Sequence, residues 1–273
     1  MIESPPVQTG VLLFAYNTPE VDYVKIADNT SRLIRHHLGL PVTLVTDSYS
    51  TKPEFDYQKI IHTDYVQPSN SRPWNGTTFQ WKNRGRHHAY DLTPYDTTLL
   101  LDVDYLVLSD KLINLIITCD EYSLMSDSRD YVGILDNAMG VNALPFVWAT
   151  AVVFRRRSKT RQLFDLIKRI EANYSYYSSL FNTDRESYRN DYVFAMADWI
   201  LNGYALDRRH RQPYNMLTVS DPITAMEHRG DFVTVRHQDR AAVISRQDLH
   251  VMDKYYLYSD DFAEFVEQEC QRG

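Results

Sequence analysis

The sequence predicts an α/β fold in which a mainly parallel sheet forms the N-terminal half of the chain. Three observations support this fold class. Residues 11–16 (VLLFAY) and 42–45 (VTLV) are short apolar runs typical of buried strands. Between them, over residues 21–38, apolar side chains recur at the spacing of a helix. The order strand, helix, strand favours parallel strands joined by a crossover helix, and the apolar run 99–108 (LLLDVDYLVL) adds a further strand.

Turn-forming residues set the ends of these elements. The segment Asn17-Thr18-Pro19 ends the first strand, Gly39 and Pro41 end the helix, and Asp47 follows the second strand. Ligands of parallel sheets bind beyond the carboxyl ends of the strands, which is where Asn17 and Asp47 are expected to lie. The remaining patterns predict a third strand at 59–62, helices at 79–92, 163–170 and 192–201, and interrupted strands over 217–244.

Length and composition limit the classes of protein to which this chain can belong. The chain has 273 residues, 44% of them hydrophobic, so it can bury a sizeable core as one domain, with or without an appended lobe. Its 29 basic and 36 acidic side chains give a net charge of −7, which disfavours wholesale wrapping of nucleic acid but leaves local basic patches open. Cys119 and Cys270 lack CxxC spacing, which fits a reducing compartment. We find no leader peptide and no apolar run of about 18 residues, so we expect a soluble, cytoplasmic protein without a membrane partner.

Two carboxylates interrupt the apolar run at 99–108. Asp102 and Asp104 are two positions apart, so in a continuous strand both side chains point to the same face. A buried pair of carboxylates is costly unless a cation neutralises it. Hard oxygen ligands suit Mg²⁺ or Mn²⁺, which would hold the phosphates of a nucleotide or nucleotide sugar. The alternative is that one aspartate caps a turn and the other faces solvent.

Residues 86–107 (RHHAYDLTPYDTTLLLDVDYLV) resemble the glycogenin-like branch of the GT-A fold glycosyltransferases. In that family a basic residue opens a helix, a Leu-Thr-x-Tyr step follows, and a DxD motif closes a strand. The resemblance implies a single GT-A-like domain with two halves. Residues 1–110 would form a Rossmann-like half that binds the nucleotide sugar and ends in the DxD strand, and residues 111–273 a smaller, mixed half for sugar and acceptor. It also implies that Asp102 and Asp104 bind Mn²⁺ or Mg²⁺ against the diphosphate of a donor, for which a UDP-sugar is favoured.

The same resemblance implies further donor-binding residues. His250 would be the third metal ligand and Lys254 would contact the diphosphate, although DLHVMDK at 248–254 differs from the family's HxxGxxKP. Arg86 would reach the donor, unless Lys82 or Arg84 does so or all three lie on a solvated helix face. Asn17 and Asp47 match positions that contact the base and ribose. Their alternative roles are those of turn and helix-capping residues.

Two segments of the second half match the family's sugar site in part. Residues 148–154 (WATAVVF) resemble a strand that usually carries Asn-Ser-Gly, and Thr150 falls within it. Arg189-Asn190-Asp191 resembles an acidic Asp-Gln step near the reacting sugar carbon. Asp191 is therefore the candidate catalytic residue, for orienting the sugar or for acceptor-side chemistry, with a helix N-cap as its alternative. The resemblance favours retention of the anomeric configuration.

The acceptor and the competing functions remain open at this stage. The acceptor hydroxyl could belong to a glycan, a small molecule or a hydroxylated base in DNA, because basic clusters occur at 82–88, 155–161 and 208–211. A haloacid-dehalogenase-like phosphatase also has an apolar strand ending in DxD, but there the motif belongs to the first strand of the chain. A nucleotide or nucleic-acid binding module without activity is the non-enzymatic alternative.

Overall fold

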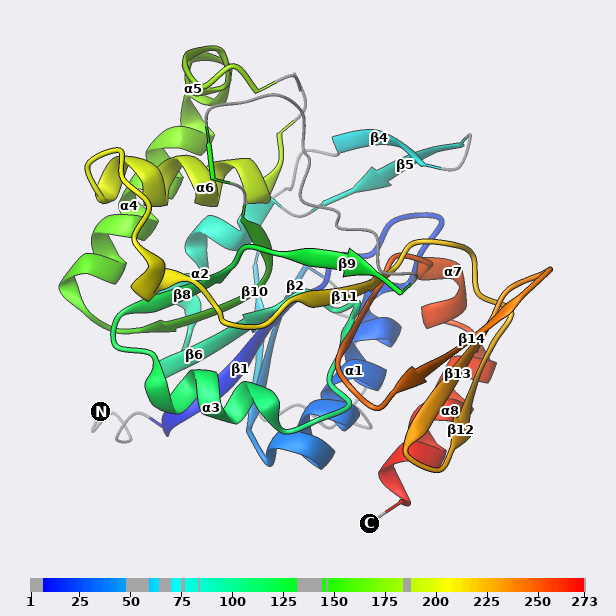
Figure 1. Ribbon diagram of the computed structural model, residues 1–273. Coiled ribbons are helices and arrows are strands. Elements are labelled where there is room, and N and C mark those ends of the chain that lie inside the picture. Colours follow the sequence, from blue (N-terminus) through cyan, green and yellow to red (C-terminus); the bar gives the residue numbers. More distant parts are fainter. Residues whose placement is uncertain are drawn as a thin grey trace.

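A six-stranded sheet forms the centre of the protein in the order β3-β2-β1-β6-β10-β8 (Figure 1). The structure, a computed structural model, describes residues 7–47, 59–63, 70–74, 77–82, 84–131, 144–145, 147–183 and 188–272. The first four strands in this order are parallel, and they are β3 (Lys59–His62), β2 (Val42–Thr46), β1 (Val7–Phe14) and β6 (Tyr95–Leu101). The last two are β10 (Trp148–Arg155), which is antiparallel to both its neighbours, and β8 (Tyr122–Met125). The predicted α/β fold with a mainly parallel sheet is therefore confirmed.

Helices cover both faces of this sheet. On one face lie α1 (Tyr23–Leu38) and α3 (Lys111–Thr118), which share a hydrophobic core with the sheet. The Asp22 side chain caps α1 by accepting a hydrogen bond from Lys25 N, and Gly39 ends the helix in the left-handed conformation, at φ 63°. The other face carries α2 (Ala89–Leu92), α4 (Ser158–Ala172) and α6 (Asn190–Leu201), and α5 (Tyr174–Leu180) follows α4 directly. The predicted helices at 163–170 and 192–201 lie within α4 and α6.

Smaller sheets complete the second half of the chain and bring residues that are distant in the sequence to the end of β6. One has the order β7-β15-β11-β9, with β7 (Tyr105–Leu106), β15 (Leu249–Val251), β11 (Met216–Val219) and β9 (Ser128–Asp130). A second contains β12 (Ala225–Arg229), β13 (Phe232–Arg236) and β14 (Ala241–Ser245), and α7 (Lys254–Leu257) and α8 (Asp260–Cys270) end the chain. Because β15 pairs with β7, His250 lies opposite Tyr105, the residue that follows Asp104.

Two predicted elements differ from the structure. The strand predicted over 99–108 is interrupted, because β6 ends at Leu101 and the chain makes a turn, closed by a hydrogen bond from Tyr105 N to Asp102 O (3.1 Å), before β7. The helix predicted over 79–92 begins later. Its first residues pair in a hairpin of β4 (Asn70–Trp74) and β5 (Thr77–Trp81), and a 3₁₀ turn, η1 (Arg84–His88), leads into α2. The β-branched and aromatic residues of β5 favour strand pairing, and Gly85 weakens a helix at this point.

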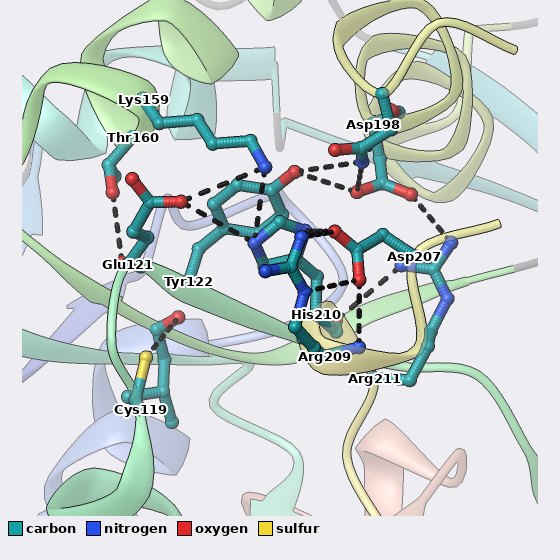
Figure 2. A network of polar contacts seen from close by, with 12 residues as sticks. Cys119, Glu121, Tyr122, Lys159, Thr160, Asp198, Asp207, Arg209, His210 and Arg211 are labelled. Atoms are coloured by element: carbon teal, nitrogen blue, oxygen red, sulfur yellow. Dashed lines mark hydrogen bonds and ion pairs between the residues drawn. The ribbon is translucent and has the colours of Figure 1, made fainter. Parts of the chain in front are cut away.

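A buried polar network links the segment between α6 and β11 to β8, an edge strand of the large sheet (Figure 2). The fully buried carboxylate of Asp198 accepts hydrogen bonds from Tyr122 Oη (2.9 Å), Asn202 Nδ2 (2.9 Å) and Arg211 Nη2 (2.6 Å). The ring of His210, in η2 (Arg208–His210), stacks on Tyr122 with ring centroids 4.0 Å apart. This network covers the edge of β8, which would otherwise offer unpaired backbone groups. Among the described helices, none is both long and apolar enough to cross a membrane.

We expect Gly10→Ala to destabilise the protein by about 1–3 kcal/mol, the usual cost of overpacking a core. A Cβ atom at Gly10, in β1, would overlap with the ring of Tyr95, whose hydroxyl group is hydrogen-bonded to Thr43 Oγ1 (2.8 Å). Urea denaturation of the wild type and the variant would measure the change in the free energy of unfolding. The double variant Gly10→Ala, Tyr95→Leu should cost less than the sum of the two single changes, and strict additivity would contradict the proposed overlap.

Candidate active site

One pocket lies where β1 and β6 end and β10 begins, at the edge of the sheet where parallel strands bind ligands. It contains six of the eight predicted site residues: Arg86, Asp102, Asp104, Asp191, His250 and Lys254. The other lining residues are Phe14, Tyr16, Tyr23, Lys82, Val103, Trp148, Ala149, Thr150, Arg189, Asn190 and Met252. Asn17 and Asp47 are not among the lining residues.

The two carboxylates of the DxD motif extend from the turn after β6. Its backbone is fixed to β10 by a hydrogen bond from Asp102 N to Thr150 O (2.8 Å). Asp102 forms an ion pair with Arg86 Nη1, and its side chain is 33% exposed, whereas that of Arg86 is 3% exposed. Asp104 is buried, forms an ion pair with Lys254 Nζ, and lies 3.6 Å from His250 Nε2. The turn therefore brings both carboxylates to one pocket, although not through the continuous strand that the sequence predicts.

The two aspartates have opposite pKa shifts. Burial raises the pKa of Asp102 to about 6, because it outweighs the opposing charge of Arg86, and the neighbouring Asp104 raises it further. Burial also acts to raise the pKa of Asp104, but Lys254 and His250 outweigh it and hold this pKa well below its usual range. Asp104 is therefore a carboxylate throughout the neutral range.

The chemistry of these residues fits a hard divalent cation. Carboxylate oxygens and an imidazole nitrogen are suitable ligands for Mn²⁺ or Mg²⁺. Asp104 Oδ1 and His250 Nδ1 are buried and have no hydrogen-bond partner among the described residues. In the described part of the chain, no three His, Cys, Asp or Glu side chains are already arranged to hold an ion. Arg86 and Lys254 provide the positive charge beside the two carboxylates.

Asp191 links α6 to β10 at the pocket. Its Oδ1 accepts a hydrogen bond from Ala149 N (2.9 Å) in β10, and its Oδ2 accepts one from Arg189 Nη2 (3.2 Å). The N-cap residue of α6 is Arg189, and Asp191 lies in the first turn of the helix, so the N-cap role considered for Asp191 is not observed. Its carboxylate instead fixes the start of α6 against the start of β10.

Asn17 and Asp47 lie at the ends of β1 and β2, as predicted. The side chain of Asn17 accepts a hydrogen bond from Val24 N (3.0 Å), so the alternative role at the start of α1 is observed for this residue. Asp47 lies 3.5 Å from Lys82 Nζ and is linked to the pocket through that side chain. Contact of either residue with a base or ribose stays a prediction.

Sequence reasoning did not identify Arg189 or the aromatic wall of the pocket as functional. The wall comprises Phe14, Tyr16, Tyr23 and Trp148. The Trp148 ring lies edge-on to His250, with ring centroids 6.1 Å apart. Both rings had a signal in the sequence, because Tyr16 ends the first apolar run and Trp148 begins the segment that resembles the family's sugar-site strand.

The three basic clusters do not all lie at the pocket. Cluster 82–88 contributes Lys82 and Arg86 to the pocket. Clusters 155–161 and 208–211 lie side by side, because Lys159 Nζ is 3.5 Å from His210 Nε2 (Figure 2). Arg155 stands at the end of β10 remote from Trp148, so the start of cluster 155–161 lies at the opposite edge of the sheet from the pocket.

Solved structures similar to this chain identify its fold. No family model and no curated protein matches the sequence. The solved structure of the galactosyltransferase LgtC in complex with donor and acceptor sugar analogues is similar with a TM-score of 0.52 and 12% identity, over 96% of this chain and 95% of that one. Two structures of the glycosyltransferase GlyE from Streptococcus pneumoniae TIGR4 give TM-scores of 0.39 and 0.40 at 13% and 12% identity, over 71% and 74% of this chain. The chain spans only 43% and 46% of those two structures. At such low identity the likeness to LgtC establishes the fold alone, and the chain therefore has the GT-A-like fold that its sequence predicts.

Proposed function

We propose that the protein is a metal-dependent glycosyltransferase that transfers a sugar from a nucleotide sugar, preferably a UDP-sugar, to an acceptor hydroxyl with retention of configuration. The observation that carries this proposal is the convergence of Asp102, Asp104, His250 and Lys254 on one pocket at the ligand-binding edge of the sheet. The likeness of nearly the whole chain to a galactosyltransferase solved with donor and acceptor sugar analogues supports the same reaction class.

The residues of the pocket suit the charges that develop in glycosyl transfer. Positive charge builds on the sugar and negative charge on the departing diphosphate. A bound Mn²⁺ or Mg²⁺, held by Asp102, Asp104 and His250, would supply Lewis-acid stabilisation of that diphosphate. The ammonium group of Lys254 and the guanidinium group of Arg86 line the same pocket and would stabilise the diphosphate directly. No proton transfer to the leaving group is needed.

Asp191 is proposed to orient the sugar rather than to take a proton. Both of its carboxylate oxygens already accept hydrogen bonds, one from Ala149 N and one from Arg189 Nη2. These two hydrogen bonds fix the direction of the carboxylate, as a group that positions the sugar requires. A retaining transfer can proceed without a carboxylate base on the face opposite the leaving group, and this agrees with the retention that the sequence favours.

The competing functions have less support. In a dehalogenase-like phosphatase the first aspartate of DxD is a nucleophile on the first strand, whereas Asp102 follows β6 and is paired with Arg86. For the acceptor, the described residues give no particular support to DNA, since the start of cluster 155–161 lies at the opposite edge of the sheet from the pocket. A glycan or a small molecule is therefore the acceptor that we would test first.

A thermal-shift screen tests the proposed donor. We expect UDP-sugars with Mn²⁺ to raise the melting temperature, because a ligand at 100 times its Kd adds about 2.7 kcal/mol of stability. For a chain of this size that corresponds to a rise of roughly 5 °C. GDP-, CMP- and dTDP-sugars, and every donor in the presence of EDTA, should give smaller shifts. The absence of any Mn²⁺-dependent shift with all donors would contradict the proposal.

Measuring the release of UDP distinguishes an enzyme from a binding module without activity. Release of UDP from the donor identified in the screen should depend on Mn²⁺ and increase when a suitable acceptor is added. A donor that binds but releases no UDP, with or without candidate acceptors, would favour the non-catalytic alternative.

A further inference from the structure

Each cationic side chain in the described part of the pocket is already paired with a carboxylate. Arg86 pairs with Asp102 and Lys254 with Asp104, the two residues proposed to bind the metal. Farther out, Lys82 lies 3.5 Å from Asp47, and Arg189 lies 3.2 Å from Asp191. Four positive and four negative groups therefore balance one another before any ligand is bound.

A divalent ion and a diphosphate would both interact with the groups of these ion pairs. A divalent ion would bind to the two carboxylates whose charges Arg86 and Lys254 already neutralise, although Asp104 Oδ1 has no hydrogen-bond partner among the described residues. A diphosphate needs the N–H groups of those two cations, and it would be repelled by the carboxylates beside them. Each ligand that binds alone therefore competes with one member of an ion pair and leaves the other member without its partner's full charge.

The two inner cations have groups with which to form new contacts. Arg86 uses Nη1 for Asp102, while its Nε and Nη2 are buried without a hydrogen-bond partner among the described residues. Lys254 stands at the start of α7, and its Nζ also donates to Val251 O (3.2 Å). Both side chains line the pocket.

We infer that Arg86 and Lys254 are internal counterions that compete with the metal for Asp102 and Asp104, so that the divalent ion and the donor diphosphate bind cooperatively. When both ligands are present, the metal takes the carboxylates and the two cations take the phosphates, and every charge keeps a partner. This inference rests on the proposed function and adds a role for the two cations in the absence of donor.

The experiment measures Mn²⁺ affinity from the electron paramagnetic resonance signal of free Mn²⁺, with the full chain, in the absence of UDP and at saturating UDP. We expect UDP to tighten Mn²⁺ binding at least tenfold, and Mn²⁺ must tighten UDP binding by the same factor. Equal Mn²⁺ affinities with and without bound UDP would overturn the inference while leaving the proposed function intact. Failure to bind UDP at any Mn²⁺ concentration would overturn the UDP-sugar donor of the proposed function, and the inference with it.

A variant of Lys254 tests whether this residue competes with the metal for Asp104 or only contacts the diphosphate. Lys254→Met removes the counterion of Asp104, so we expect Mn²⁺ alone to bind at least fivefold more tightly than it binds the wild type. The same variant should bind UDP more weakly in the presence of Mn²⁺. If Lys254 were only a diphosphate ligand, Mn²⁺ affinity without UDP would not increase, and that result would overturn the inference.

Two further variants serve as controls for the Lys254→Met experiment. Lys168→Met is the matched control, because Lys168 forms an ion pair with Asp91 on the surface outside the pocket, and it should leave both affinities unchanged. Lys254→Gln removes the charge but keeps a polar side chain, and it replaces Lys254→Met if thermal melting shows that the latter is unfolded. An increase in Mn²⁺ affinity with Lys254→Gln would support the inference in the same way, and no increase would overturn it.

Discussion

Asp104→Asn should weaken Mn²⁺-dependent binding of the sugar nucleotide by about 100-fold or more, while the protein stays folded. The substitution keeps the shape of the side chain and removes its charge. Asp104 is the buried member of the DxD pair, beside Lys254 and 3.6 Å from His250 Nε2, so its loss affects the metal, the imidazole and the ammonium group together. A 100-fold loss corresponds to about 2.7 kcal/mol, which is a realistic value for one charged metal ligand.

Calorimetric titration of UDP in the presence of Mn²⁺ would measure this effect, and circular dichroism would check the fold. Asp110→Asn is the matched control, because Asp110 is exposed at the start of α3 and its side chain makes no capping hydrogen bond. The control should bind UDP as the wild type does. An Asp104→Asn variant that is folded and keeps its Mn²⁺-dependent affinity would show that this carboxylate is not a metal ligand.

Local patterns predicted the first half of the fold well. The helix expected over 21–38 is observed at Tyr23–Leu38, and the runs at 11–16 and 42–45 correspond to β1 and β2. These elements were predictable because their hydrophobic spacing and their caps, Asp22 and Gly39, are encoded within a few residues of one another. Local spacing predicts a helix for residues 79–81 of β5, because the hairpin partner that makes them a strand lies outside the predicted segment.

Six of the eight predicted site residues line one pocket, but the geometry of that pocket could not be predicted from the sequence. Strand alternation predicts that Asp102 and Asp104 share one face of a strand, whereas a turn after β6 brings them together. His250 joins them through the pairing of β15 with β7, a contact between distant parts of the chain that no spacing in the sequence reveals. The resemblance supplied His250 and Lys254 because it carries such long-range information. Arg189 was missed because its role depends on the position of Asp191 against Ala149 N.

Glu269→Gln should lower the free energy of unfolding by about 3 kcal/mol at pH 7, the usual cost of removing one partner from a buried ion cluster. Glu269 lies in α8 and its side chain is fully buried. Its carboxylate is 3.1 Å from both His37 Nε2 and Arg246 Nη1, and 3.0 Å from His228 Nδ1, which links α8 to α1, to β12 and to the residue that follows β14. Urea denaturation would measure the loss. Glu267→Gln, an exposed change two residues earlier, should have little effect.

The dependence on pH distinguishes the charge of Glu269 from its packing. Burial acts to raise the pKa of Glu269, but His37, Arg246 and His228 outweigh it and lower the pKa below the ordinary value of 4.5. A carboxyl group with a lowered pKa in the folded state contributes stability above its unfolded pKa and loses that contribution as the pH falls through its folded pKa. The difference in unfolding free energy between wild type and Glu269→Gln should therefore be smaller at pH 3 than at pH 5. A difference that does not change over this range would assign the effect to side-chain packing, since the volume of the glutamine is the same at both pH values.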